Sequence, residues 1–75
     1  MEKVIIYSSS TCKVCKKAKE WFKSENISFE ERNIDKNREY IDFLIENDFR
    51  GVPVIVIGDK KFLGFKEEEI REALK

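Results

Sequence analysis

The sequence predicts a small α/β domain with the element order βαβαββα, in which three helices flank a mixed four-stranded sheet. Short runs of strand character alternate with amphipathic helical stretches along the chain. A βαβ crossover makes the first two strands parallel, and a Gly-Asp turn adds an antiparallel hairpin near the end. The 75 residues are expected to form a single domain, residues 1–75.

Four stretches have the composition of strands. Residues 3–7 contain a continuous β-branched and aromatic run, which predicts a buried strand. Residues 27–34 alternate apolar and polar side chains, which predicts a strand with one solvated face. Val54–Ile57 reads as a third strand, buried on both faces, and Lys60–Leu63 as a short fourth strand after a turn at Gly58-Asp59.

Three stretches have helical periodicity. The first helix begins near Cys12 and ends near residues 24–26, and its apolar stripe comprises Val14, Ala18, Trp21 and Phe22. We expect Trp21 and Phe22, and also Tyr7 from the first strand, to lie in the core. The second helix covers about residues 36–47, with Asp35 as its N-cap. The third covers residues 67–74.

Composition and charge exclude several function classes. Fifteen basic and fifteen acidic residues cancel, which argues against a nucleic-acid footprint and against a polybasic membrane anchor. No apolar run approaches the roughly 18 residues of a membrane span, and no secretory apolar region is visible at the start. We therefore expect a cytoplasmic protein that binds neither nucleic acid nor membrane, and we expect a monomer.

The chain has only two cysteines, and they form the motif Cys12-Lys13-Val14-Cys15. A secreted disulfide scaffold carries more cysteines at wider spacings. A bridge that closes so short a loop also removes little entropy from the unfolded chain, so a structural disulfide is disfavoured. The spacing puts both sulfurs on one face of a helix, where they can form a disulfide.

The position of Cys12 at a helix start favours its thiolate. Free backbone N–H groups and the positive end of the helix dipole point at this residue, and nearby lysines add positive charge. We expect Cys12 to be substantially ionised at neutral pH and to attack a substrate disulfide. Cys15 is expected to be more buried, to stay protonated until needed, and to release the substrate by attacking Cys12.

A metal- or cluster-binding module without turnover is the alternative. The chain has no histidine and no further cysteine, so one copy supplies only two sulfur ligands, fewer than a closed zinc site needs. Small copper-carrier domains also have a CxxC motif after a first strand, but their order is βαββαβ. The apolar positions Tyr40, Phe43 and Leu44 predict a second helix where those domains have a hairpin.

Two further segments are candidates for the site. Val52-Pro53 precedes a buried strand, where proline is normally excluded except at the first residue. In a CxxC domain of this layout we expect a cis Val52–Pro53 bond, which leaves the Val52 backbone free to pair with an extended substrate. Gly64 serves either as a helix-entry turn or as a point of close approach to substrate, and Phe65 either belongs to the core or contacts a partner.

The chain resembles the glutaredoxin family in three segments that occur in family order and span most of its length. These segments are YSSSTCKVC (residues 7–15), GVPV (residues 51–54) and LGF (residues 63–65). The resemblance implies a thioredoxin-like fold, a cis proline, disulfide reduction, and glutathione or a thioredoxin-reductase-type protein as reductant, with no bound cofactor and no metal. Its candidate substrate- and glutathione-binding residues are Thr11, Lys13, Val14, Val52, Pro53, Gly64 and Phe65.

The sequence differs from most of that family where glutathione is held. Lys13-Val14 stands where the family has Pro-Tyr, and Gly64-Phe65-Lys66-Glu67 replaces a Gly-Gly-acidic run. The latter is more similar to the small redoxins that serve ribonucleotide reductase and often draw electrons from thioredoxin reductase. The resemblance therefore implies disulfide-containing proteins as partners, such as ribonucleotide reductase or a peroxide or sulfoxide reductase.

Overall fold

The computed structural model describes residues 3–74, which follow the predicted order βαβαββα. The strands are β1 (Val4–Ser8), β2 (Glu30–Asn33), β3 (Val54–Ile57) and β4 (Lys60–Leu63), and the helices are α1 (Lys13–Ser24), α2 (Arg38–Glu46) and α3 (Glu67–Leu74). The longest helix, α1, has 12 residues. Within residues 3–74, no helix is both long enough and apolar enough to cross a bilayer.

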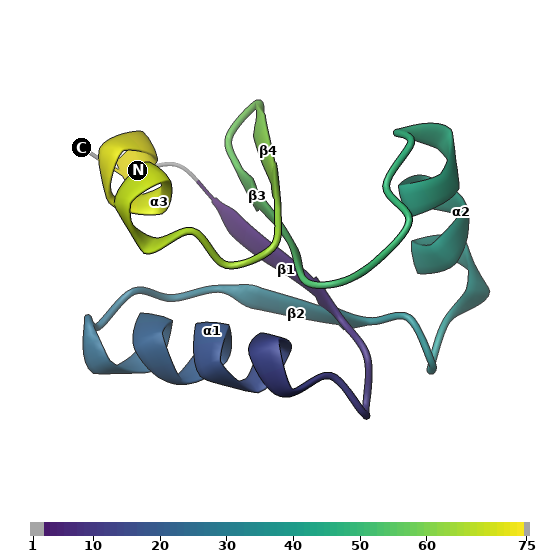
Figure 1. Ribbon diagram of the computed structural model, residues 1–75, viewed down its shortest axis with the longest axis horizontal. Helices are drawn as coiled ribbons and strands as arrows, with labels where there is room; N and C mark the ends of the chain where they lie inside the picture. Colours follow the sequence, from purple (N-terminus) through teal and green to yellow (C-terminus); the bar gives the residue numbers. More distant parts are fainter. Residues whose placement is uncertain (1–2, 75) are drawn as a thin grey trace.

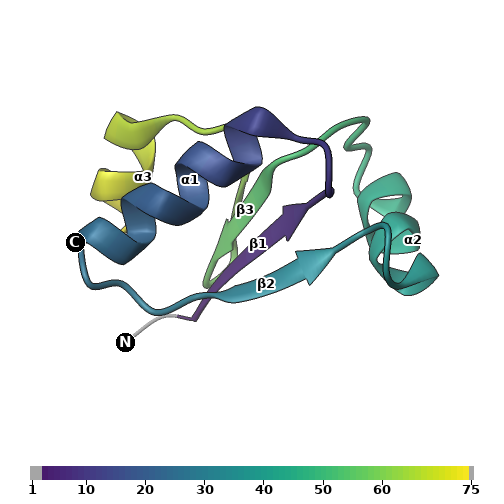
Figure 2. The same cartoon turned by 90° about the horizontal axis from the view of Figure 1, so that it is seen from below.

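The four strands form one mixed sheet in the order β2-β1-β3-β4. The two central strands, β1 and β3, run antiparallel to each other, β2 pairs parallel with β1, and β4 pairs antiparallel with β3. Helices α1 and α3 cover one face of this sheet and α2 the other (Figures 1 and 2). The arrangement confirms the predicted mixed four-stranded sheet with three flanking helices.

Side-chain alternation along the central strands builds a core on each face of the sheet. Val4 and Ile6 of β1 point toward α1 and α3, where they pack with Phe22. Tyr7 points the other way, toward α2, and stacks on Phe43 with ring centroids 4.6 Å apart. Because successive residues of a strand face opposite sides, a strand buried on both faces must be apolar throughout, as β3 is.

The turns lie where glycine predicts them. Gly58 has φ +61° and begins the turn that joins β3 to β4, which confirms the predicted hairpin. A positive φ is accessible to glycine because it has no Cβ. The pairing of Val54 with Leu63 and of Ile57 with Lys60 sets the hairpin register.

The second strand and second helix differ from their predicted bounds. The strand is Glu30–Asn33 rather than residues 27–34, because β2 lies at the sheet edge and only Glu30 to Asn33 align with β1. The helix is Arg38–Glu46, and its N-cap is Asn37, whose side-chain oxygen accepts a hydrogen bond from the Glu39 amide at 2.9 Å. The prediction of Asp35 as N-cap was therefore wrong.

The apolar stripe of α1 is also narrower than predicted. Ala18 and Phe22 are fully buried, and Trp21 is half-buried against the same core. Val14, by contrast, is 47% exposed, so its assignment to the interior stripe was wrong. It lies in the first turn of α1 beside Cys15, and it is the buried Cys15 that turns inward there. The predictions that Tyr7 and Phe22 belong to the core were correct.

Removing one methylene group from the centre of the sheet should destabilise the fold. Ile6 is fully buried, whereas Ile45 on α2 is 65% exposed. We expect Ile6→Val to lower the free energy of unfolding by about 1 kcal/mol, because the shorter side chain leaves a cavity. The matched exposed change Ile45→Val should stay within about 0.5 kcal/mol of wild type. Urea denaturation followed by circular dichroism measures both, and equal effects would contradict the described core.

Candidate active site

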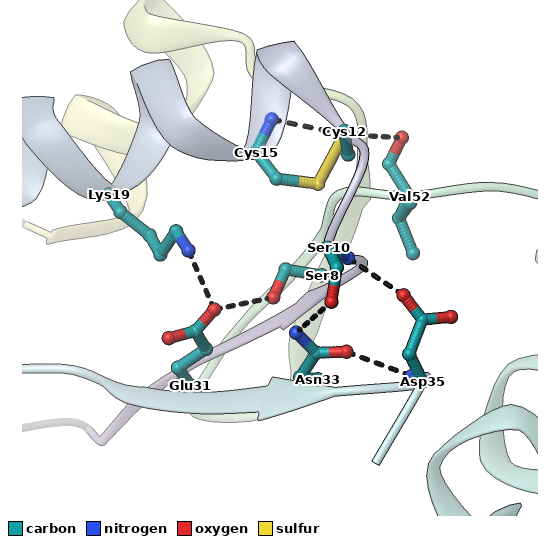
Figure 3. The surroundings of a disulfide bond; sticks show 9 residues. All are labelled: Ser8, Ser10, Cys12, Cys15, Lys19, Glu31, Asn33, Asp35 and Val52. Carbon is teal, nitrogen blue, oxygen red and sulfur yellow. Dashed lines mark hydrogen bonds and ion pairs between the residues drawn. A yellow bond between two sulfur atoms is a disulfide. The ribbon is translucent and has the colours of Figure 1, made fainter. Parts of the chain in front are cut away.

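The two cysteines lie where the loop after β1 enters α1. Cys12 is the N-cap of α1, with φ −85° and ψ 113°, and its Sγ accepts a hydrogen bond from the Cys15 amide at 3.1 Å. A disulfide joins the two sulfurs, with Cα atoms 5.3 Å apart (Figure 3). Cys12 lies at the start of the helix and Cys15 inside its first turn, as predicted. The Cys12 sulfur serves as N-cap because the first amide groups of a helix need an acceptor.

The two sulfurs differ in their access to solvent. Cys12 is half-buried at the surface, whereas Cys15 is completely buried. The amide hydrogen bond and the positive end of the α1 dipole favour negative charge on the Cys12 sulfur. Burial opposes charge on the Cys15 sulfur. The pair therefore combines one sulfur suited to attack with one that is protected from solvent.

The Val52–Pro53 segment lies against the cysteine pair. Its peptide bond is cis, as the sequence predicts. The Val52 carbonyl oxygen lies 3.8 Å from Cys12 Sγ, and Figure 3 shows Val52 beside the disulfide. Pro53 is buried and directly precedes β3. A backbone carbonyl beside Cys12 can accept a hydrogen bond from an extended peptide backbone.

Gly64 and Phe65 follow β4, and Gly64 contacts the Val52–Pro53 segment. The Gly64 amide donates a hydrogen bond to the Pro53 carbonyl at 2.8 Å, so the third family segment contacts the second. Gly64 has φ +86°, a conformation that favours glycine. Phe65 is half-buried and packs against Trp21 of α1, with ring centroids 5.7 Å apart. Phe65 thus contributes to the core on the α1 side.

Thr11 and Lys13 are exposed and line a groove of about 570 Å³ that opens beside Cys12. Three segments line this groove: the polar loop 9–12, the lysine-bearing face of α1, and residues just before and along β2, namely Phe29, Glu31 and Asn33. Val14 is not part of the groove lining, although it is exposed next to the cysteine pair. The structure therefore brings Thr11, Lys13 and Val14 to the surface around the disulfide.

A polar cluster near the disulfide was not predicted from the sequence. Ser8 is fully buried at the end of β1 and donates a hydrogen bond to Glu31 at 2.8 Å, and the Lys19 ammonium binds the same carboxylate oxygen at 2.6 Å. The Lys19 contact, and then the Ser8 hydroxyl, hold the pKa of the Glu31 carboxyl below its usual 4.5. Figure 3 shows the three side chains meeting beneath the cysteine pair.

The loop before Cys12 is held by a second polar cluster. The Ser10 amide donates to Asp35 at 2.8 Å, and the Asn33 side chain donates to the Ser10 hydroxyl at 3.3 Å. The Asp35 amide in turn donates to the Asn33 side-chain oxygen at 2.8 Å (Figure 3). Asp35, predicted as a helix cap, instead anchors the loop that carries Cys12.

No group of three or more His, Cys, Asp or Glu side chains within residues 3–74 lies close enough to hold a metal ion. Cys12 and Cys15 provide two sulfur ligands, whereas structural zinc sites have four ligands. The described residues therefore supply no metal-binding group around the cysteine pair.

A CxxC pair at the start of a helix is the reacting group of thiol–disulfide oxidoreductases, and the strand and helix arrangement is the thioredoxin-like fold. The chain belongs to the glutaredoxin family: the family model described as Glutaredoxin matches residues 4–62. The protein is accordingly a glutaredoxin-like disulfide oxidoreductase.

Curated relatives match over nearly their whole length. The glutaredoxin-like protein NrdH of Lactococcus lactis subsp. lactis is 40% identical over 67 residues, which cover 89% of this chain and 93% of the relative. An uncharacterized glutaredoxin-like 8.6 kDa protein in a rubredoxin operon of Clostridium pasteurianum is 44% identical over 68 residues, 87% of this chain and 88% of that protein.

Solved structures give the same result. The NrdH-redoxin of Escherichia coli superimposes with a TM-score of 0.88 at 28% identity, over 93% of this chain and 92% of that structure. The glutaredoxin of Archaeoglobus fulgidus gives a TM-score of 0.82 at 36% identity, over 100% of this chain and 88% of that structure. Both similarities confirm the thioredoxin-like fold.

The lowered pKa of Glu31 predicts a pH-dependent contribution to stability. A carboxyl whose pKa is lower in the folded chain stabilises the fold above its unfolded pKa, near 4.5, and loses this effect as pH falls through the folded pKa. Because the Glu31 side chain is 37% exposed and solvent screens its charge, Glu31→Gln should cost about 1 kcal/mol or less at pH 7.

Urea denaturation of wild type and Glu31→Gln between pH 7 and pH 3 measures this contribution. The difference in unfolding free energy should shrink as pH falls below 4.5, where the Glu31 carboxyl becomes protonated first in the unfolded chain and then, at lower pH, in the folded chain. Glu46→Gln is the matched control, since Glu46 is exposed on α2 and makes no ion pair among residues 3–74. A Glu31 effect that is constant with pH would show that the carboxylate charge is not responsible.

Proposed function

We propose that Cys12 is the nucleophile and Cys15 the resolving thiol of a dithiol oxidoreductase that reduces disulfides in other proteins. The observation that carries this proposal is the hydrogen bond from the Cys15 amide to Cys12 Sγ at the start of α1. This hydrogen bond supports a thiolate at Cys12, which is half-buried. Cys15 is fully buried, so a substrate disulfide in solution cannot contact it directly.

The first step forms a mixed disulfide. The Cys12 thiolate attacks one sulfur of the substrate disulfide, a new sulfur–sulfur bond forms to Cys12, and the other substrate sulfur leaves as a thiolate. This leaving thiolate takes up a proton. The Val52 carbonyl, 3.8 Å from Cys12 Sγ, supports binding of an extended substrate backbone next to the new bond.

The second step releases the substrate. Cys15 loses its proton and attacks Cys12 Sγ, so that the Cys12–Cys15 disulfide forms and the second substrate sulfur leaves as a thiolate. Two electrons have then passed from the dithiol to the substrate disulfide. The 5.3 Å between the two Cα atoms lets the second sulfur reach the first, since disulfides form at 4.4–6.8 Å.

We infer a thioredoxin-reductase-type protein, rather than glutathione, as the source of the two electrons that regenerate the dithiol. After Gly64 the chain continues with Phe65, which packs on Trp21, and the basic Lys66, where most glutaredoxins have a Gly-Gly-acidic run. The Escherichia coli relative, whose fold matches with a TM-score of 0.88, is described as having a thioredoxin-like activity profile.

We infer ribonucleotide reductase as one protein substrate, on the similarity of residues 63–67 to the small redoxins that serve it and on the NrdH relatives. A peroxide or sulfoxide reductase uses the same dithiol chemistry.

The reduced dithiol persists only in a reducing compartment, which supports a cytoplasmic location.

Substituting the two cysteines separately tests their roles. We expect Cys12→Ser to lower the rate of model disulfide reduction at least about a hundredfold, because a serine hydroxyl is not ionised at neutral pH. Cys15→Ser should still form the mixed disulfide but not resolve it, so that a covalent adduct of protein and substrate accumulates. Mass spectrometry under non-reducing conditions detects this adduct.

Ser28→Ala serves as the control, since Ser28 is exposed in the segment before β2. It should reduce the model disulfide at the wild-type rate. Full activity of Cys12→Ser, or an adduct attached to Cys15 rather than Cys12, would refute the assignment of nucleophile and resolving thiol.

The electron source is tested by coupled turnover. Reduction of a protein disulfide is followed through NADPH oxidation with thioredoxin reductase, and separately with glutathione and glutathione reductase. We expect at least about a tenfold higher kcat/KM with thioredoxin reductase, which corresponds to about 1.4 kcal/mol of transition-state stabilisation. Equal or faster turnover with glutathione would overturn this choice and leave the cysteine roles untouched.

A further inference from the structure

We propose that the groove beside Cys12 binds an acidic segment of the substrate protein, next to the cysteine that is reduced. This inference deepens the proposed function, because it rests on Cys12 being the sulfur that attacks. It assigns a substrate class, disulfide-containing proteins with Asp or Glu close to the reacting cysteine. The observations that carry it are the charge of the groove, its dimensions and its continuity with the sulfur.

Charge is distributed unevenly over a chain that is neutral as a whole. Basic and acidic residues number fifteen each in the sequence, yet α1 carries five lysines and one glutamate. The other helices are acidic: α2 has three acidic residues and one arginine, and α3 has four and one. A positive region therefore surrounds the start of α1, and such a region attracts acidic partners.

The groove collects this positive charge. Four of its twelve lining residues are lysines, and two are glutamates. Lys19 is already paired with Glu31 at 2.6 Å, which leaves Lys13, Lys16 and Lys23 against the single carboxylate of Glu20. None of these three lysines forms an ion pair with another residue in the range 3–74. The groove thus has a net positive charge available for a ligand.

The dimensions suit a short extended segment. The lysines of α1 that line the groove, from Lys13 to Lys23, form what we call the lysine wall. These two residues are ten positions apart, so the wall is about 15 Å long at about 1.5 Å per residue. An extended peptide advances about 3.3 Å per residue, so about four or five residues span this wall. The loop next to Cys12 also offers the hydroxyl groups of Ser9 and Thr11, which can donate to a carboxylate.

The reacting sulfur lies at the rim of the same groove, because Cys12 is one of the lining residues. A substrate backbone that pairs with Val52 next to Cys12 can therefore continue along the lysine wall. The acidic residues are accordingly expected within about five positions of the substrate cysteine, the length that the wall accommodates.

Peptide disulfides with opposite charges test the proposal. Each peptide has one central cysteine, held as a mixed disulfide with 2-mercaptoethanol, and is flanked on both sides by Glu and Ser or by Lys and Ser. We expect the reduced wild-type protein to reduce the acidic peptide at least about tenfold faster than the basic one at about 0.02 M salt. The ratio of the two rate constants should fall toward one at about 0.5 M salt, where charges are screened.

Two double variants with the same change in net charge distinguish binding in the groove from general electrostatic attraction to the protein. Lys16→Glu with Lys23→Glu alters the groove, whereas Lys17→Glu with Lys60→Glu alters exposed lysines outside it. The acidic-to-basic rate ratio should fall at least about tenfold in the groove variant and less than about threefold in the control. Comparing two substrates of the same variant cancels any change in the reactivity of the Cys12 thiolate.

Equal losses of preference in the two variants, or an unchanged ratio in the groove variant, would overturn the proposal. Binding of serine versions of the peptides, measured by fluorescence anisotropy, tests the groove without turnover, and the groove variant should lose its preference for the acidic peptide there too. The proposed oxidoreductase roles fail separately, if wild type does not reduce the small neutral disulfide of 2-mercaptoethanol.

Discussion

The hydrogen bond from the Cys15 amide to Cys12 Sγ is the interaction around which the site is organised. It makes Cys12 the N-cap of α1, so the same contact that begins the helix also directs amide dipoles at the Cys12 sulfur. Cys15 is buried because it lies on the same face of α1 as Ala18 and Phe22, three and seven residues further along the helix. Local structure and redox chemistry therefore have a common origin here.

The sheet determines what lies near that sulfur. Because β1 and β3 are adjacent and antiparallel, the end of β1 lies next to the start of β3 at the same end of the sheet. This brings the loop before Cys12 beside Val52 and Pro53. The Gly64 amide then joins the end of β4 to Pro53. Strand pairing, together with this hydrogen bond, thus brings Val52, Pro53 and Gly64 close to Cys12, from which they are forty or more residues away in the chain.

Much of this arrangement could be predicted from the sequence. The order of elements follows from periodicity, and the start of α1 at Cys12 follows from the apolar stripe at Ala18 and Phe22. Contacts between distant polar residues could not be predicted. The pairing of Glu31 with Ser8 depends on the register between β1 and β2, and the contact of Asp35 with Ser10 depends on how a loop folds back. The sequence indicated only that the predicted strand over residues 27–34 contains charged side chains, and it did not indicate their partners.

The unequal burial of the two sulfurs also constrains the order of events in a catalytic cycle. An incoming thiolate can reach the oxidised protein only at Cys12 Sγ, because Cys15 has no exposed surface. In the cycle proposed above, the reductant that regenerates the dithiol therefore approaches through the opening that the substrate uses. Under that proposal the two partners compete for one face, and the protein meets donor and acceptor in strict alternation.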